Sequence, residues 1–281
     1  MGQVMEHAET VEGYEAVPLA LPDQACLPGS GAAVLRRRSA RPGRRAVMYV
    51  HCRGDSFAPE DLVGWYTDRG FHFYAADLRE VGADERPGGD GNQVAQDLGD
   101  CFACLDAAAA HMREVDAIDA KIVSAHGAGA VIAALWCHAR RGSQPADALV
   151  LASPSWATAP SWPEWARHGA AKRPPAARPS PLLVGARRRL RRGLDIACPV
   201  LVMCPATGWN APGGAGGLLV PRALTLRRAT MRLGEHVTWL KLAGGLPGQA
   251  MPEGTARRRV FDELGRWLSA YLSGQIRDQL L

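Results

Sequence analysis

Short, almost continuously apolar segments alternate along the chain with segments whose apolar residues recur at helical spacing. The apolar segments have the pattern of strands buried on both faces of a parallel sheet, and they cover residues 46–50, 72–76, 122–125, 148–152, 200–204 and 237–242. Helical patterns cover residues 60–69, 94–113, 130–140, 224–233 and 257–272. Upstream, residues 14–21 and 32–38 are predicted to form an antiparallel hairpin leading into the sheet. The alternation predicts one α/β domain over residues 1–281, built on a mostly parallel, doubly wound sheet.

One proline-rich segment interrupts this alternation. Residues 156–181 contain six prolines, a density that prevents long helices and central strands. The same segment contains Trp156, Trp162 and Trp165, which argue against a disordered linker. We therefore predict a short Pro/Trp-rich cap insertion at residues 156–183, with the three tryptophans on its underside against ligand or core.

Composition places the chain among ordinary globular proteins. Of its 281 residues, 47% are hydrophobic and 22% are charged, and no apolar run approaches the roughly 20 residues that cross a bilayer. Residues 1–10 are polar and acidic, unlike a signal peptide, so a cytoplasmic location without membrane contact is expected. Seven cysteines, an odd number lying mostly in apolar segments, suit reduced thiols better than a disulfide framework.

The net charge of +5 does not by itself indicate a nucleic-acid partner. Almost all of the basic residues are arginine, which together with abundant Ala, Gly and Pro suggests the codon bias of a GC-rich genome. Arginine clusters at residues 36–38, 187–192 and 257–259 are expected to be solvated faces. Because no zinc-ligand spacing and no RNA-binding aromatic motif accompanies them, neither nucleic acid, nor a metal, nor a cofactor is predicted.

Three short motifs each lie next to a predicted strand, and their order along the chain is distinctive. His-Cys-Arg-Gly at residues 51–54 and Asp-Leu-Arg at residues 77–79 each follow a strand, and Ser-Ala-His-Gly-Ala-Gly at residues 124–129 lies between a strand and an apolar helix. They resemble the oxyanion loop, the Asp-Leu-Arg segment and the nucleophile elbow of the α/β-hydrolase superfamily, in its lysophospholipase-like and serine-aminopeptidase-like members. The resemblance runs from about residue 14 to residue 272 and implies an α/β-hydrolase fold.

The chain departs from this family at all three positions of the catalytic triad. Gly127 stands where the elbow carries its serine, and Pro247 stands where the histidine is expected before the last helix. No Asp or Glu occurs between Cys198 and Glu235, and Arg222 lies in the region equivalent to the acid. Removing the nucleophile of a serine hydrolase lowers turnover by roughly 10⁶. The sequence therefore predicts a degenerate triad, and a glycine that adopts the positive φ of the elbow without strain.

The backbone of the site is expected to keep its geometry although the side chains of the triad are lost. By resemblance, the oxyanion-hole donors are the N–H groups of Ala128 and Arg53, and a hole of this kind polarises a carbonyl without a serine. Cys52 replaces the glycine that usually follows the histidine of the loop. It is a candidate nucleophile or, as the alternative, an inert buried thiol.

Four further side chains are candidates for acid, base or positioning roles. His126 is a candidate acid or base, although the family carries a histidine there without a catalytic role. His51 is expected to help hold the oxyanion loop. Asp55 and Ser56 are the nearest acid and hydroxyl to the vacated position, and a solvated loop tip is their alternative interpretation.

Three functions stay open on the sequence alone. The first is a non-hydrolytic enzyme of cyclase, lyase or isomerase type, acting on an apolar, carbonyl-containing small molecule that is free or carrier-bound, in specialised-metabolite biosynthesis. The second is a non-catalytic pseudo-hydrolase that binds a ligand or supports a partner. The third is a hydrolase whose nucleophile has moved, for example to Cys52 or Ser56.

Overall fold

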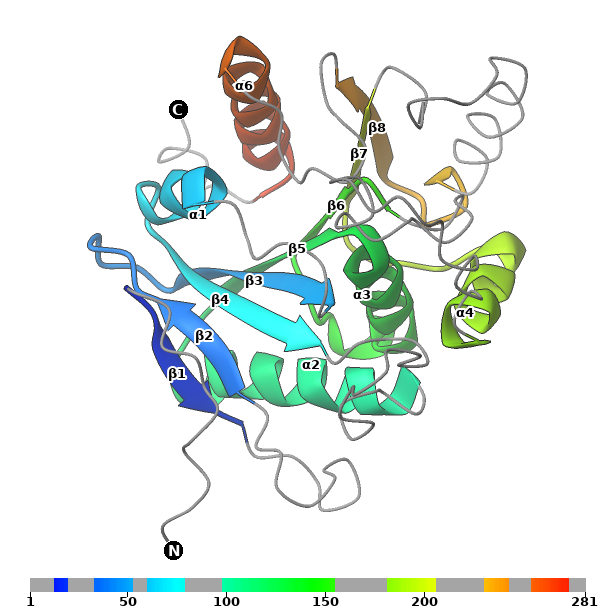
Figure 1. Ribbon diagram of the computed structural model, residues 1–281, viewed down its shortest axis with the longest axis horizontal. Coiled ribbons are helices and arrows are strands. Elements are labelled where there is room, and N and C mark those ends of the chain that lie inside the picture. Colours follow the sequence, from blue (N-terminus) through cyan, green and yellow to red (C-terminus); the bar gives the residue numbers. More distant parts are fainter. Residues whose placement is uncertain are drawn as a thin grey trace, which may run out of the picture.

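A single mixed sheet organises the part of the chain described by the computed structural model, which is residues 13–19, 33–52, 60–78, 98–154, 181–205, 230–242 and 254–272. Eight strands in these residues form the sheet in the order β1-β2-β4-β3-β5-β6-β7-β8 (Figure 1). The strands are β1 (Glu15–Pro18), β2 (Ala33–Arg37), β3 (Arg45–Cys52), β4 (Phe71–Leu78), β5 (Ala120–His126), β6 (Ala148–Ala152), β7 (Val200–Pro205) and β8 (Val237–Leu242).

Strand directions agree with the hydrophobic pattern. Neighbouring strands in the sheet order β4-β3-β5-β6-β7-β8 pair in parallel. Strands β1 and β2 form an antiparallel hairpin, and β2 also pairs antiparallel with β4. The predicted doubly wound sheet and its leading hairpin are therefore confirmed. All six predicted central strands are present, and β6 and β8 have the predicted bounds.

Helices cover both faces of the sheet. They are α1 (Glu60–Thr67), α2 (Leu98–Glu114), α3 (Gly127–Ala139), α4 (Pro181–Arg192) and α6 (Gly254–Tyr271), with a 3₁₀ turn, η2 (Arg141–Ser143). One core cluster joins α2, α3 and α4 to one face, and a second joins α1 and α6 to the other (Figure 1). The alternation of β3 explains this, because Met48 and Val50 enter the first core while Val47 and Tyr49 enter the second.

Several helices differ from their predicted bounds: α1 ends at Thr67 rather than at residue 69, α2 ends at Glu114 rather than at residue 113, and α6 covers Gly254–Tyr271 rather than residues 257–272. The helix predicted over residues 130–140 begins earlier, at Gly127, because a tertiary contact described below overrides the low helix propensity of glycine. Helix α4 was not predicted, since the arginine run of residues 187–192 masked its pattern. Pro181 occupies its first turn, where proline is tolerated, and its Ala186 and Leu190 are buried while Arg188 and Arg189 are exposed.

Several predicted elements extend beyond the described residues. The first four residues of the helix predicted over 94–113 lie outside them, and α2 is described from Leu98 onward. Of the helix predicted over 224–233, only residues 230–233 are described, and a turn follows Thr230. Residues 156–180 of the predicted cap also lie outside the described residues, while residues 181–183 belong to α4.

The solvated face predicted for residues 36–38 is wrong for Arg36. This side chain is only 7% exposed, because its guanidinium reaches across the hairpin to Asp116, at 2.7 Å from each carboxylate oxygen, and to Glu15, at 2.7 Å. The Tyr74 hydroxyl also donates to Asp116, at 2.7 Å. Burial works to raise the pKa of Asp116, but the hydrogen bonds from Tyr74 and Arg36 outweigh burial and lower it. The carboxylate therefore stays charged and holds the hairpin against the turn after α2.

Replacing Asp116 with asparagine will lower the free energy of unfolding by about 3 kcal/mol, because the buried Arg36 charge loses its main partner. Urea unfolding at pH 7 measures the change. Glu114→Gln is the matched control, since its pair with Arg113 is largely exposed, and it should change stability by less than about 0.5 kcal/mol. Equal stability of Asp116→Asn and the wild type would contradict the structural role assigned to this pair.

Candidate functional site

The turn between β5 and α3 has the strand–turn–helix geometry of a nucleophile elbow. Strand β5 ends at His126, and Gly127 begins α3 with φ of +55°, in the left-handed region. A residue with a side chain is strained there by about 1–3 kcal/mol, whereas glycine is not. The positive φ expected at residue 127 is confirmed, and the apex of the turn carries no hydroxyl or thiol.

Helix α3 touches the end of β3 directly through its backbone. A Cβ atom built on Gly129 would lie 2.6 Å from the carbonyl oxygen of Val50 and 3.1 Å from Cα of His51. Only glycine permits this approach, since real Cβ atoms do not come so close to backbone. The contact brings the first turn of α3 to the carboxyl ends of β3 and β5, where the sequence motifs meet.

The first turn of α3 has no side-chain cap and no acidic residue. His126 occupies the N-cap position but makes no side-chain hydrogen bond to the helix, and the first turn contains no acidic residue. The backbone N–H groups at a helix start lack intrahelical partners, and the helix dipole gives them a partial positive charge. Ala128, in this turn, is partly exposed. The arrangement can therefore donate hydrogen bonds to a carbonyl oxygen placed above Gly127.

Two buried histidines stand beside this turn. His51, near the end of β3, is 5% exposed, and His126, at the end of β5, is 6% exposed. Burial, with a smaller contribution from repulsion by the nearby His51, lowers the pKa of His126 to about 4. Its Nε2 atom has no hydrogen-bond partner among the described residues. At neutral pH the ring is therefore uncharged, with one nitrogen able to donate and the other able to accept a proton.

Four of the residues singled out from the sequence meet at this edge of the sheet, namely His51, His126, Gly127 and Ala128. Cys52 is the last residue of β3, and its backbone pairs with Leu78 of β4. The remaining candidates lie outside the described residues: Arg53, Asp55, Ser56, Trp156, Trp162, Trp165, Arg222 and Pro247.

The sequence analysis did not predict that His51 and His126 are both buried. The available signal was their position at or next to the ends of apolar strands that the helices cover on both faces. Within the described ranges, no three His, Cys, Asp or Glu side chains are grouped as a metal ion requires. No helix among the described residues has the length and apolar character needed to cross a membrane.

Comparison with known families gives one match that covers more than half of the chain. A family model described as serine aminopeptidase, S33, matches residues 41–191, slightly more than half of the chain. No curated protein matches the sequence significantly.

Solved structures are similar in fold at low sequence identity. Est1E from Butyrivibrio proteoclasticus is 10% identical over 92% of this chain and 98% of its own, with a TM-score of 0.58. Thermogutta terrifontis esterase 2 is 16% identical over 96% of this chain and 100% of its own, with a TM-score of 0.58. Paleococcus ferrophilus monoacylglycerol lipase is 14% identical over 85% and 99%, also with a TM-score of 0.58. These likenesses establish the α/β-hydrolase fold, and one structure of Est1E holds ferulic acid.

Gly129→Ala will disrupt the contact between α3 and β3. The added methyl group must move the helix away from the Val50 carbonyl, and we expect the free energy of unfolding to fall by about 2–3 kcal/mol. Gly64→Ala in α1 is the control, because a Cβ there meets nothing within 4 Å and should leave stability unchanged or raise it slightly. Chemical denaturation of both variants checks this, and equal behaviour of the two would contradict the close approach.

His126 will make stability depend on pH below neutrality. Its pKa falls from the ordinary 6.5 to about 4 on folding, so the unfolded chain binds the proton first as pH falls. The stabilisation is complete above pH 6.5 and is lost as pH falls toward 4, by about 3 kcal/mol in total. Urea unfolding from pH 7.5 to 4 measures the slope, which His126→Gln should reduce. A variant that keeps the full slope would show that another group causes it.

Proposed function

The chain belongs to the serine aminopeptidase S33 family, and within that family we propose that it acts without a serine nucleophile. The proposed activity is that of a non-hydrolytic enzyme of cyclase, lyase or isomerase type. Its substrate is an apolar, carbonyl-containing small molecule. The triad is proposed to be degenerate at Gly127, Arg222 and Pro247.

A single observation carries this proposal, which is the conformation of Gly127. The backbone keeps the elbow, with φ of +55° at the start of α3, while the side chain that forms the acyl-enzyme is absent. Covalent catalysis through residue 127 therefore has no attacking atom. The N–H groups of the same turn depend only on backbone, so they remain available to a substrate oxygen.

The chemistry left to such a site is polarisation and proton transfer. N–H groups at the start of α3, with that of Ala128 as the proposed donor, stabilise negative charge that develops on a substrate oxygen. One such donor is worth about 3–4 kcal/mol in known oxyanion holes. His126 is uncharged at neutral pH and buried at the same edge, so it is the proposed group that accepts or returns a proton. His51 is the proposed positioning residue beside it.

The substrate class is inferred from the surroundings. The fold relative Est1E binds ferulic acid, an aromatic molecule with a carboxyl group. The proposed tryptophan-lined cap would supply apolar walls of the kind that small-molecule sites use. Exposed Arg188, Arg189 and Arg192 on α4 would attract an anionic carrier-bound form of the substrate. A biosynthetic role in specialised metabolism fits these features.

We expect the wild-type protein to resist labelling by a fluorophosphonate and to hydrolyse activated aryl esters no faster than the buffer. Gly127→Ser should also stay unlabelled, because Pro247 is proposed to stand where the family carries the histidine that activates the serine, and it should be less stable by about 1 kcal/mol or more. Mass spectrometry of the labelled protein and urea unfolding provide the two measurements.

The outcomes separate the alternatives. Labelling of a wild-type serine would overturn the proposal in favour of a hydrolase with a relocated nucleophile. Thermal-shift screening with apolar carbonyl compounds and acyl thioesters then tests the site itself. A hit that is bound and converted supports the enzyme, whereas a hit that is bound and returned unchanged by all reaction assays would favour the non-catalytic ligand-binding function.

A further inference from the structure

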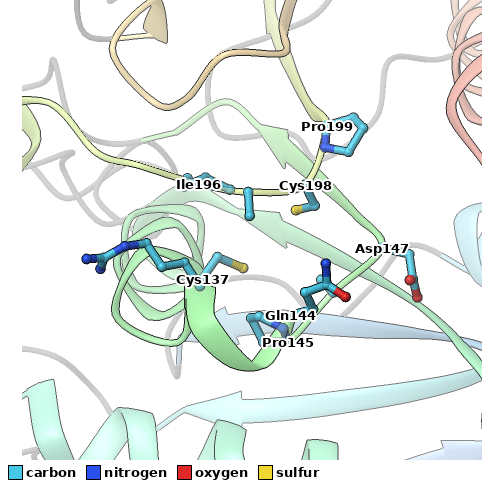
Figure 2. A pocket seen from close by; sticks show the side chains of 10 residues that line it. Cys137, Gln144, Pro145, Asp147, Ile196, Cys198 and Pro199 are labelled. Carbon is cyan, nitrogen blue, oxygen red and sulfur yellow. The ribbon is translucent and has the colours of Figure 1, made fainter.

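A cavity lies at the edge of the sheet opposite to the elbow. It has a volume of about 190 Å³ and is lined by the last turn of α3, the segment before β6 and the segment before β7 (Figure 2). The elbow stands at the carboxyl ends of parallel strands, while this cavity stands at the amino ends of β6 and β7. The two sites therefore share α3 and no lining residue.

Two cysteines from distant parts of the chain meet in this cavity. Cys137 comes from the last turn of α3 and Cys198 from the segment before β7, and both are free thiols. Figure 2 shows their sulfur atoms directed into the same space between the helix and that segment. The two side chains are close enough that each shifts the pKa of the other thiol.

The two thiols are unequal. Cys137 is buried, whereas Cys198 is partly exposed beside the cavity, so a molecule entering the cavity reaches Cys198 first. The hydrogen bond from Cys137 lowers the pKa of Cys198, against the opposing effect of burial. The same hydrogen bond, together with burial, raises the pKa of Cys137. Thiol–disulfide exchange requires an accessible thiol with a lowered pKa, which attacks, and a second thiol beside it, which resolves the mixed disulfide.

We propose that Cys198 and Cys137 form a redox-modification site, in which Cys198 reacts with a small disulfide in the cavity and Cys137 completes an intramolecular disulfide. The site is independent of the proposed activity at the elbow.

The reaction is a two-step exchange. The Cys198 thiolate attacks one sulfur of the small disulfide, whose S–S bond breaks, and the leaving thiolate takes up a proton. Cys137 then loses its proton and attacks Cys198, forming the protein disulfide and releasing the second small thiol. Two protein thiols are oxidised by two electrons, and one small disulfide is reduced to two thiols.

The local structure allows the second step. A disulfide needs its sulfur atoms about 2.0 Å apart, so the hydrogen-bonded thiols must approach further. Cys137 is held within a helix, but Cys198 lies in the bend between the isolated bridge of Ile196 and the start of β7. Formation of the disulfide therefore requires rotation of the Cys198 side chain together with a movement of this bend.

Charged groups around the cavity adjust the first step. Asp147, in the segment before β6, acts to raise the pKa of Cys198 by repulsion, and Arg141 of η2 supplies a positive charge to the lining. Arg141 pairs with Asp195 at 3.1 Å, with both side chains largely exposed. A carboxylate group of a small disulfide would form an ion pair with the Arg141 guanidinium at the cavity wall.

The test uses the full-length reduced protein and oxidised glutathione as the probe, with remaining thiols blocked before peptide mass spectrometry. We expect the wild type to form the disulfide between Cys137 and Cys198 without a lasting adduct. Cys137→Ser should instead accumulate one glutathione on Cys198, because the resolving thiol is gone. Cys198→Ser should form neither product. Cys104→Ser, which alters a partly buried thiol on α2, should behave as the wild type.

A second comparison separates a reactive pair from two cysteines that merely lie close. Cys137→Ser keeps a hydroxyl donor for Cys198, whereas Cys137→Ala removes it, so glutathionylation at pH 7 should be at least about threefold slower in the alanine variant. Equal rates in these two variants, modification of Cys198 no faster than that of Cys104, or a wild-type disulfide that joins other cysteines would each overturn the proposal.

Discussion

The close approach of two backbones at Gly129 is the constraint on which the rest of the site depends. A side chain there would collide with the Val50 carbonyl, so the position must be glycine for α3 to start against the end of β3. That start brings unpaired N–H groups to the carboxyl edge of the sheet and buries His51 and His126 beside them. Burial at this edge, with a smaller effect of the nearby His51, lowers the pKa of His126.

Gly127 and Gly129 differ in what they do, although they are two residues apart. Gly129 is required by space, whereas Gly127 sits at a conformation that other members of the fold occupy with a strained nucleophile. A serine at the apex stores strain that the surrounding structure must hold, and glycine removes that strain together with the attacking oxygen. The proposed activity rests on the idea that a chain which keeps this helix start without a nucleophile would still bind and polarise a substrate.

The sequence predicted the fold well because burial on both faces leaves a strong local signal. Strands β6 and β8 were predicted to the residue, and the elbow was located from its motif. The failures have one physical origin, namely partners distant in sequence. Arg36 is buried because its guanidinium donates hydrogen bonds to Asp116 at the edge of the sheet. Helix α4 forms because Ala186 and Leu190 pack into the core on one face of the sheet. No local pattern records such contacts, and the same holds for the meeting of Cys137 and Cys198.

Helix α3 gives its two ends opposite electrostatic characters, and each end suits the chemistry proposed for it. At the N-terminus, partial positive charge on the N–H groups of the first turn favours negative charge developing on a substrate oxygen. At the C-terminus, partial negative charge on the last carbonyl groups opposes ionisation of Cys137, which lies in the final turn. Cys198 lies outside the helix, where its own backbone N–H and the Cys137 thiol both favour the thiolate. In the proposed reaction the helix polarity thus adds to the greater exposure and lowered pKa that favour Cys198 as the attacking sulfur, with Cys137 left to resolve the mixed disulfide.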